Sequence, residues 1–347
     1  MYKNKIYVFV FLGEFGYELL NWQGVIRKFS RNVGTSERIV VASRKGVSLL
    51  YDTVDSFIDI SSIELFNNSI ASGYGLNNPD IKLYSDYDKY CNHRFLSEIY
   101  SIKNYKYIQT LKNIIKENIG RRLVELFGEK NKIIYVFSDH TVTLNGLQFG
   151  RKHRDKHDIY YNLDVNNNEY TKLKADETKK KLVEQKLGMS LSEKYILCQT
   201  GSREIVQRSK DVMDINDIIK TLNNRVSIVL LEFNTGRKMD SGSCFNDALY
   251  LRRYMCDSLE EQSVLIAYAS KCLFFTEGDF RSHNYLPPFF GKDVFAVANK
   301  SVFDLPTTPI DYWNEKVFKF GGQIYPIYSE RLIDKHSIEL FCERLIG

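Results

Sequence analysis

The chain has 347 residues, 44% of them hydrophobic and 26% charged, which is ordinary for a folded protein and enough for two domains. Its net charge of +5 is too small to predict nucleic-acid binding, although it is compatible with an anionic substrate or a negatively charged membrane surface. The six cysteines have no paired spacing, so the sequence predicts neither a zinc site nor a disulfide framework.

The N-terminal apolar stretch is soon interrupted by glycine and glutamate, which is not typical of a signal peptide. No later stretch approaches the length needed to cross a membrane. We therefore expect a cytoplasmic protein, with peripheral contact to the inner face of the membrane left open.

Strands and helices are predicted to alternate through residues 1–165, which we assign to an N-terminal α/β domain. Apolar runs predict strands at residues 6–11, 38–42, 57–60 and 132–137, and helical patterns occur at residues 16–30 and 105–127. Residues 67–88, rich in Asn, Gly, Ser, Asp and Tyr, are predicted to be irregular.

The first strand runs directly into a glycine-bracketed turn and a helix, FLGEFGYELLNW at residues 11–22. In an open α/β sheet this turn lies at the carboxyl end of the strand, where ligands bind. Its pattern is G-x-x-G with acids, not the G-x-G-x-x-G of a dinucleotide site, and a carboxylate would repel a pyrophosphate. We therefore expect the loop to hold a sugar or to supply a base; the alternative is that its acids only stabilise the helix N-terminus.

Two polar segments follow the strand at residues 132–137. Asp139 and His140 stand at its carboxyl end, where either could act as a general base, or where the histidine could simply bond a carbonyl. The charge run RKHRDKHD at residues 151–158 is either a solvated face or a docking site for an acidic sugar or phosphate, with Arg154 or His153 as the binding residue.

Residues 166–330 are assigned to a second α/β domain. Strands are predicted at residues 195–198, 226–231, 273–275 and 294–297, and helices at residues 170–187, 215–222 and 259–270. This alternation predicts a parallel sheet of the nucleotide-binding kind. The last segment, residues 331–347, carries a helix at residues 334–345 that could pack back on the first domain.

The loop at residues 276–291 has the most distinctive pattern of the second half. Glu277 and Gly278 follow a strand, and Ser282 and His283 start an apolar helix that ends at a pair of prolines. The hydroxyl, the imidazole and the free N–H groups of that helix start would converge on an anion, although a serine there is also an ordinary helix cap.

Two further strand ends carry polar residues. Thr200, Gly201 and Arg203 follow the strand at residues 195–198, and Glu232 ends the next strand. A cation such as Arg203 could stabilise a leaving diphosphate without a metal ion, whereas the alternative is a solvated surface loop.

These patterns resemble the two-domain glycosyltransferases of the GT-B type. The resemblance rests on the two-sheet layout, on the loop from Glu277 to the Ser282 helix, and on PPFFGKDVFAV, which is similar to the family's "lGkPvv" ending. It implies two facing Rossmann-like α/β domains with mostly parallel sheets, in which the loop at residues 276–291 holds the donor's diphosphate and ribose. It also implies a role in bacterial capsule or lipopolysaccharide synthesis, and the acid-rich first loop is similar to transferases of the acidic sugar Kdo.

The sequence therefore predicts a metal-independent glycosyltransferase, without a cofactor, that moves a sugar from a nucleotide-sugar donor to a saccharide or lipid-linked saccharide acceptor. We expect the second domain to hold the donor through Thr200, Gly201, Arg203, Glu232, Glu277, Gly278, Ser282 and His283. We expect the first domain to supply catalysis through Glu14, Asp139 and His140, and to hold the acceptor through Gly13, Phe15, Gly16, Tyr17, Glu18 and Arg154.

Two rival functions remain open at this point. A sugar-nucleotide epimerase of the same two-domain shape would need no acceptor, and a non-catalytic basic-surface binding protein would be indifferent to Glu14→Ala. The sequence does not identify the nucleotide, the sugar, the acceptor, the stereochemical course or the oligomeric state.

Overall fold

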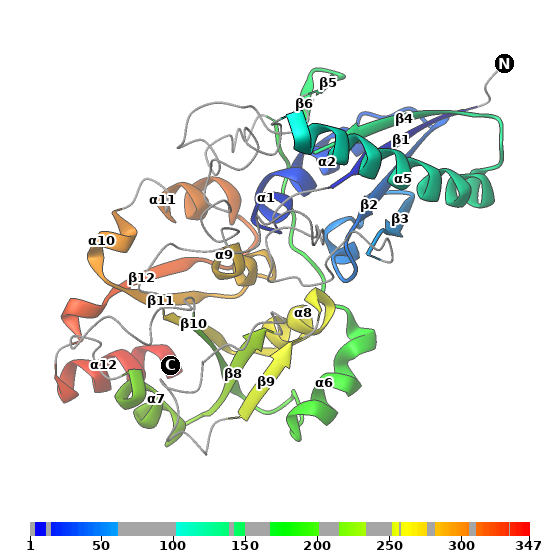
Figure 1. Cartoon of the computed structure of the whole chain (residues 1–347). Helices are drawn as coiled ribbons and strands as arrows, with labels where there is room; N and C mark the ends of the chain where they lie inside the picture. The colour runs from blue at the N-terminus through cyan, green and yellow to red at the C-terminus, as the bar shows by residue number, and fades with distance from the viewer. Residues whose placement is uncertain are drawn as a thin grey trace. The chain divides into compact units, whose positions relative to one another are not determined.

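The computed structural model divides the chain into two compact units, Met1–Tyr170 and Thr171–Gly347, each with its own sheet (Figure 1). The division lies after Tyr170, whereas the sequence analysis divides the chain after residue 165. The structure describes residues 4–11, 15–61, 102–138, 142–149, 167–200, 215–233, 252–256, 258–275, 282–304, 310–332 and 334–347.

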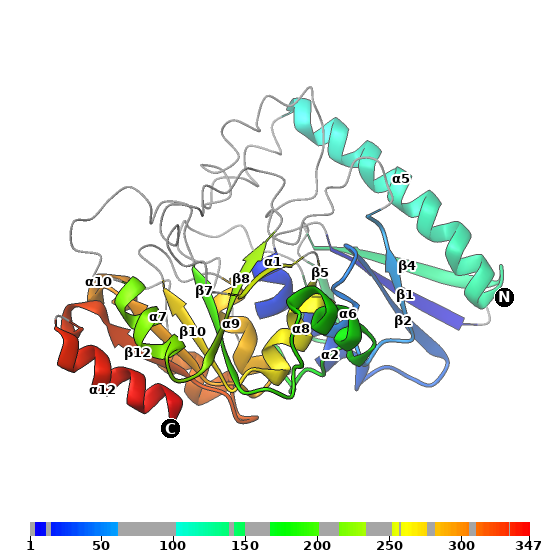
Figure 2. The ribbon, with the colours of Figure 1, turned by 90° about the horizontal axis from the view of Figure 1, so that it is seen from below.

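The first unit is built on a parallel sheet in the order β3-β2-β1-β4. Its strands are β1 (Asn4–Val10), β2 (Glu37–Ser43), β3 (Ser56–Asp59) and β4 (Asn131–Phe137), and they correspond to the predicted apolar runs. Helix α2 (Gln23–Ser30) covers one face, and the long helix α5 (Ile102–Phe127) covers the other (Figure 2).

Strand β1 is buried on both faces because its side chains alternate between two apolar layers. Ile6, Val8 and Val10 pack in one cluster with the inner face of α5. On the other face the ring of Phe9 meets Phe29 of α2 edge-on, with 5.4 Å between centroids. Each such side chain contributes roughly 1.5–3 kcal/mol by burial, so β1 holds α2 and α5 to the sheet.

Between β1 and α2 the chain forms a short α-helical turn, α1 (Phe15–Tyr17), and then a π-helical turn, η1 (Glu18–Trp22). The sequence predicts one unbroken α-helix at residues 16–30, whereas the structure has the wider π turn η1 before α2. All residues of η1 are buried, and the Gln23 side chain donates a hydrogen bond of 3.1 Å to the Leu19 carbonyl within it. Single π turns are frequent at functional sites.

Strands β5 (Val142–Leu144) and β6 (Leu147–Phe149) form a hairpin that the sequence analysis did not predict. Its turn is Asn145-Gly146, with φ of 49° and 78°, as a two-residue hairpin of this hand requires. The Asn-Gly pair between apolar residues was the available signal.

The second unit has a parallel sheet in the order β12-β11-β10-β7-β8-β9. From β9 to β12 this is the order 3-2-1-4-5-6 of dinucleotide-binding Rossmann folds. The strands are β7 (Tyr195–Thr200), β8 (Ser227–Phe233), β9 (Arg252–Cys256), β10 (Lys271–Phe275), β11 (Val294–Ala298) and β12 (Ile324–Tyr328). The sequence predicts four of these strands, and misses β9 and β12.

Helices cover both faces of this sheet (Figure 1, Figure 2). Helices α7 (Ile215–Asn223) and α12 (Lys335–Ile346) share one apolar cluster with the strands. Helices α8 (Leu259–Tyr268) and α9 (Ser282–Phe289) lie on the other face, where the Tyr195 hydroxyl of β7 donates to the Leu265 carbonyl of α8.

The C-terminal helix α12 packs on α7, where Phe341 and Leu345 join Ile218 and Leu222 in one apolar cluster. One expectation about a helix is wrong. The helix expected at residues 170–187 is confined to α6 (Lys180–Leu187) and the short turn η4 (Glu177–Lys179), because the preceding segment makes other contacts, such as Leu173 N–H to the Phe289 carbonyl at 2.7 Å.

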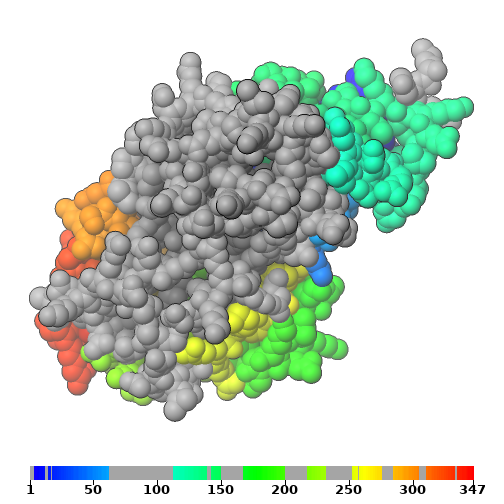
Figure 3. All heavy atoms as spheres, viewed as in Figure 1, coloured from blue at the N-terminus to red at the C-terminus, as the bar shows by residue number. Residues whose placement is uncertain are grey.

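The remaining short elements lie in both units. They are η2 (Ser48–Leu50), α10 (Lys300–Phe303), α11 (Ile310–Tyr312), the π turn η5 (Trp313–Val317) and η6 (Ser329–Arg331). Side chains of the C-terminal half of α5 reach the surface, as Figure 3 shows, and Val124 is 44% exposed there.

The close approach of Gly322 to the α9–β11 connection gives a first prediction. A Cβ at Gly322 would lie 2.6 Å from the backbone N and O of Lys292 and 2.8 Å from the Pro288 Cα. Backbone atoms cannot move aside cheaply, so Gly322→Ala should destabilise the second unit by about 1–3 kcal/mol in urea unfolding. Gly34→Ala, which meets only a Glu37 carboxylate oxygen at 3.6 Å, is the control and should stay within about 0.5 kcal/mol. Equal stability of the two variants would contradict this packing.

Candidate functional site

The second unit has its topological switch point between β7 and β10. From β7 the chain proceeds to β8 and β9 on one side, and then crosses to β10 on the other. Phe275, the last residue of β10, is in register with Thr200, the last residue of β7. Ligands of open α/β sheets bind at the carboxyl ends of strands at such a point.

Four of the predicted donor residues are described here by their backbone. Thr200 ends β7, Glu232 lies near the end of the neighbouring β8, and Ser282 and His283 are the first residues of α9. Their elements converge on the carboxyl edge of the sheet at the switch point. The other four, Gly201, Arg203, Glu277 and Gly278, lie outside the described residues, although they follow β7 and β10 directly in sequence.

The structure adds Gln199, which the sequence analysis did not single out. Gln199 is 4% exposed, and within the described part of the chain its Oε1 accepts no hydrogen bond. It lies one residue before the end of β7, and by strand alternation it faces the same side as Tyr195, toward α8. A buried amide with an unused acceptor needs a partner, and a hydroxyl or N–H group of a ligand would supply one.

The first unit has an equivalent switch point between β1 and β4. Val10 is in register with Phe137, and the Ser138 N–H donates to the Val10 carbonyl at 3.0 Å. The loops that carry Glu14 and the Asp139-His140 pair thus leave adjacent strand ends. These three residues lie outside the described residues, as do Gly13, His153 and Arg154.

Glu18 lies at the centre of a buried polar network beside this switch point. It is fully buried, and its Oε1 accepts hydrogen bonds from the Ser43 hydroxyl at 2.5 Å and from the Tyr51 hydroxyl at 2.7 Å. The Arg44 Nε lies 3.7 Å from Oε2, and the Arg44 guanidinium lies over the Phe11 ring, 6.0 Å from its centroid. The network therefore joins η1, the end of β2 and the last residue before the first loop.

Burial raises the pKa of Glu18 above its usual value, because it disfavours the charged form. The Arg44 charge and the hydrogen bonds from Ser43 and Tyr51 act in the opposite direction and offset part of the effect. Burial, together with the Glu18 carboxylate, also holds the pKa of Tyr51 well above its usual value, so Tyr51 stays a proton donor to Glu18.

These positions change the expected acceptor site. Glu18 is enclosed by protein groups, so we assign its carboxylate to the interior and not to the acceptor-binding surface. Phe15 and Gly16 are also buried, and Tyr17 is described by its backbone in α1. Sequence spacing could not reveal this, because the partners of Glu18 come from β2 and from the segment after η2.

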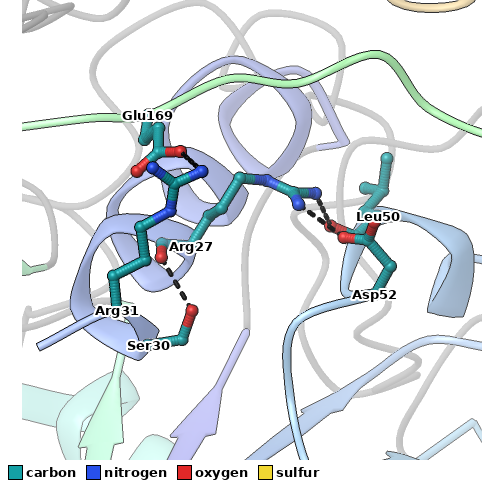
Figure 4. Close-up of polar contacts among 6 residues, drawn as sticks. All are labelled: Arg27, Ser30, Arg31, Leu50, Asp52 and Glu169. Atoms are coloured by element: carbon teal, nitrogen blue, oxygen red, sulfur yellow. Dashed lines mark hydrogen bonds and ion pairs between the residues drawn. The ribbon is translucent and has the colours of Figure 1, made fainter. Parts of the chain in front are cut away.

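A second buried cation stabilises the same unit next to this network (Figure 4). Arg27 of α2, 2% exposed, pairs with Asp52 and donates to the Leu50 carbonyl at 3.2 Å. On the neighbouring turn Arg31 pairs with Glu169. These pairs fix α2 to the segment after η2 and to the segment that ends the first unit, without contacting Glu18 in any described interaction.

In the described residues, no cluster of three or more His, Cys, Asp or Glu side chains is arranged to hold a metal ion. The same part of the chain contains no helix with the length and apolar character needed to span a membrane.

No protein-family model and no curated protein sequence matches this chain. Among solved structures, this chain superposes on a glycosyl transferase family 9 protein from Veillonella parvula DSM 2008 with a TM-score of 0.50 and 10% sequence identity. The superposition covers 100% of this chain and 92% of the Veillonella chain. The chain has a GT-B-type fold.

Two further structures have lower scores and add nothing to the assignment of the GT-B fold. The E. coli ADP-heptose lps heptosyltransferase II has a TM-score of 0.48 and 11% identity, covering 98% of this chain and 99% of its own. The UDP-GlcNAc 2-epimerase from Neisseria meningitidis has a TM-score of 0.39 and 11% identity, covering 98% and 91%.

The raised pKa of Glu18 predicts a pH-dependent stability difference. The ordinary pKa of a glutamate is 4.5, and burial raises that of Glu18 in the folded protein. As pH rises above 4.5, the unfolded chain therefore loses this proton before the folded chain does, and the free energy of unfolding falls. Glu18→Gln, which is neutral throughout, should therefore become more stable relative to wild type as pH rises from about 4 to 8 in urea unfolding.

Glu37→Gln is the matched control with the opposite sign. A hydrogen bond from the Gly34 N–H lowers the pKa of Glu37, so this carboxylate stabilises the fold above its unfolded pKa and loses that effect as pH falls. Parallel pH curves for wild type and Glu18→Gln would contradict the burial of an ionisable Glu18.

Proposed function

We propose that this protein is a glycosyltransferase that moves a sugar from a nucleotide-sugar donor to a saccharide or lipid-linked saccharide acceptor without a metal ion. The observation that carries the proposal is the second switch point. The predicted donor residues belong to, or directly follow, the ends of β7, β8 and β10, or they begin α9. These strands lie in a sheet with the strand order of dinucleotide-binding folds. The GT-B fold over the whole chain supports the same class of reaction.

In the proposed reaction the second unit holds the donor. The start of α9 would turn backbone N–H groups and the positive end of the helix dipole toward the donor, which favours the negative charge of its phosphate groups. Arg203 would neutralise the charge that develops on the phosphate of the leaving nucleotide, and Glu277 or Glu232 would accept hydrogen bonds from ribose hydroxyls. Gln199 is a further candidate to bind a donor hydroxyl or N–H group.

The first unit supplies the chemistry on the acceptor. Glu14 is our first choice for the base that takes the proton from the acceptor hydroxyl as the bond to the sugar forms, with Asp139 or His140 on the adjacent strand end as its partner or substitute. If the enzyme retains the anomeric configuration, one of these carboxylates would act as a nucleophile instead.

We place the reaction in bacterial surface polysaccharide synthesis, at the cytoplasmic side and in peripheral contact with the membrane. The basic segment around Arg154 would suit an acidic sugar or a phosphate-bearing acceptor, and a CMP-linked acidic sugar is the donor that would use both this segment and Arg203.

A nucleotide screen by thermal shift tests the donor site. One nucleotide among UDP, GDP, ADP, CMP, dTDP and NAD, at about 100 times its Kd, should stabilise the protein by about 2.7 kcal/mol and raise Tm by roughly 5–10 °C. Arg203→Ala should remove most of that shift, since a hydrogen bond to a charged group contributes about 1.5–3 kcal/mol. No shift with any nucleotide would contradict the proposal and favour a non-catalytic binding protein.

Substitution of Glu14 tests the catalytic assignment. Loss of a general base lowers turnover about 10²–10⁴-fold, so Glu14→Gln should slow nucleotide release from the sugar nucleotide by that factor while the thermal shift persists. Full activity of Glu14→Gln would move the role to Asp139 or His140. Conversion of the sugar nucleotide with no acceptor present would indicate an epimerase.

A further inference from the structure

In the described residues of the second unit, the buried polar side chains other than tyrosine and cysteine lie at one end of the fold. They belong to the end of β7 or to the first five residues of α8 and α9: Gln199, Glu261, Gln262, Ser263 and Asn284. Helix α8 follows β9 and precedes β10, two parallel strands of one sheet, so it runs antiparallel to them and begins at their carboxyl ends. The buried polar side chains thus lie near the edge that holds the switch point.

The two sequence neighbours of Gln262 have hydrogen-bond partners within the protein. The Glu261 carboxylate pairs with the Lys186 ammonium at 2.9 Å, and the Ser263 hydroxyl donates to the Glu260 carbonyl at 2.6 Å. Buried polar groups of folded proteins are normally bonded in this way, because an unbonded group has lost its hydrogen bonds to water without replacement.

Gln199 and Gln262 differ from these neighbours. Gln199 is 4% exposed and Gln262 has no exposed surface. Within the described part of the chain, neither Oε1 atom accepts a hydrogen bond, and the Gln262 Nε2 donates none. The two amides therefore hold two unused acceptors and one unused donor that folding has removed from water.

Both glutamines lie toward the carboxyl edge from one contact between β7 and α8. Side chains of β7 alternate, so Gln199 faces the same side of the sheet as Tyr195, whose hydroxyl donates to the Leu265 carbonyl at 2.5 Å. Along β7, Gln199 lies four residues beyond Tyr195. Along α8, Gln262 lies nearly one turn beyond Leu265 in the same direction, toward the switch point.

The unused groups define the chemistry of a partner. A phosphate group only accepts hydrogen bonds, so it would leave both Oε1 atoms unmatched. Adenine, cytosine and guanine each present two N–H donors and an acceptor along one edge. Uracil and thymine present one N–H between two acceptors, and would leave one Oε1 without a donor.

We propose that Gln199 and Gln262 bind the base of the donor nucleotide and select adenine, cytosine or guanine over uracil and thymine. The inference rests on the proposed function for the statement that the ligand is a nucleotide. The two Oε1 atoms accept from the two N–H groups of the base, and the Gln262 Nε2 donates to its ring nitrogen or carbonyl. Because Gln262 is fully buried, the base reaches it only when neighbouring side chains move, so binding includes a local rearrangement.

Methionine in place of each glutamine keeps the side-chain length and removes the amide. Gln199→Met and Gln262→Met should keep or raise the urea midpoint, because an apolar group replaces a buried polar group that has no partner in the protein. The same variants should raise the Kd of the tightest-binding of ADP, CDP and GDP by about 10-fold or more. A lower urea midpoint in both variants would show that the amides are bonded within the protein, and would overturn the proposal.

Gln23 of the first unit is the matched control. It is 1% exposed, and its Nε2 donates to the Leu19 carbonyl at 3.1 Å. Gln23→Met should therefore lower the urea midpoint and leave the nucleotide Kd within about twofold of wild type. A rise in Kd equal to that of Gln262→Met would show that loss of any buried glutamine weakens binding, and would overturn the assignment.

Nucleotides that differ in an exocyclic amino group test base selection directly. In calorimetric titrations of the full-length protein, CDP is compared with UDP, and ADP and GDP are compared with IDP. We expect the best amino-bearing nucleotide to bind about 10-fold or more tightly than its counterpart, and the difference to fall to about twofold in Gln262→Met. A difference that persists unchanged in Gln199→Met and Gln262→Met would overturn the role of both side chains.

The same titrations separate this inference from the proposed function. Tight binding of UDP or dTDP, with no preference for an amino-bearing base, would overturn base selection alone. Binding of none of these nucleotides would overturn both proposals. Selective binding by a protein that transfers no sugar from the matching sugar nucleotide would support the base site and overturn the proposed transfer.

Discussion

Parallel pairing of β1 with β4 and of β7 with β10 determines where chemistry can occur in each unit. Parallel strands end at the same edge of a sheet, so the loops that follow paired strands leave side by side. In open α/β sheets in general, the connections from two such strands leave in opposite directions, which favours a ligand crevice at that edge. In the first unit Glu14 and Asp139 follow a pair of such strands in sequence, and in the second unit Arg203 and Glu277 do.

The two strand-to-helix turns at these sites carry different residues. Helix α9, which follows β10, begins with the polar residues Ser282 and His283, as suits an anion. The turn after β1 instead places a buried carboxylate, Glu18, directly inside the fold, with Arg44 as its counter-charge.

The first unit contains buried charged side chains. Glu18 and Arg27 are both buried beside η1 and α2, yet their partners differ: Arg27 is neutralised by an exposed carboxylate, whereas Glu18 is enclosed by hydroxyls and an arginine. The first arrangement fastens α2 to the segment after η2. The second also reaches the ring of Phe11, the last described residue after β1.

The amino-acid sequence by itself determined the periodic elements and the polar strand ends. Uninterrupted apolar runs made β1, β4, β7 and β10 predictable, and glycine with polar residues after each run marked the ligand edge, because both signals are local. The sequence analysis missed β9 because Arg252 and Arg253 give it no apolar run, and it missed β12 because Pro326 interrupts the apolar residues of that segment. Both segments become strands by pairing with β8 and β11. Tertiary structure alone decided the surroundings of Glu18. The sequence analysis placed it with the acceptor-binding residues, but its hydrogen-bond partners Ser43 and Tyr51 come within reach only when the chain folds.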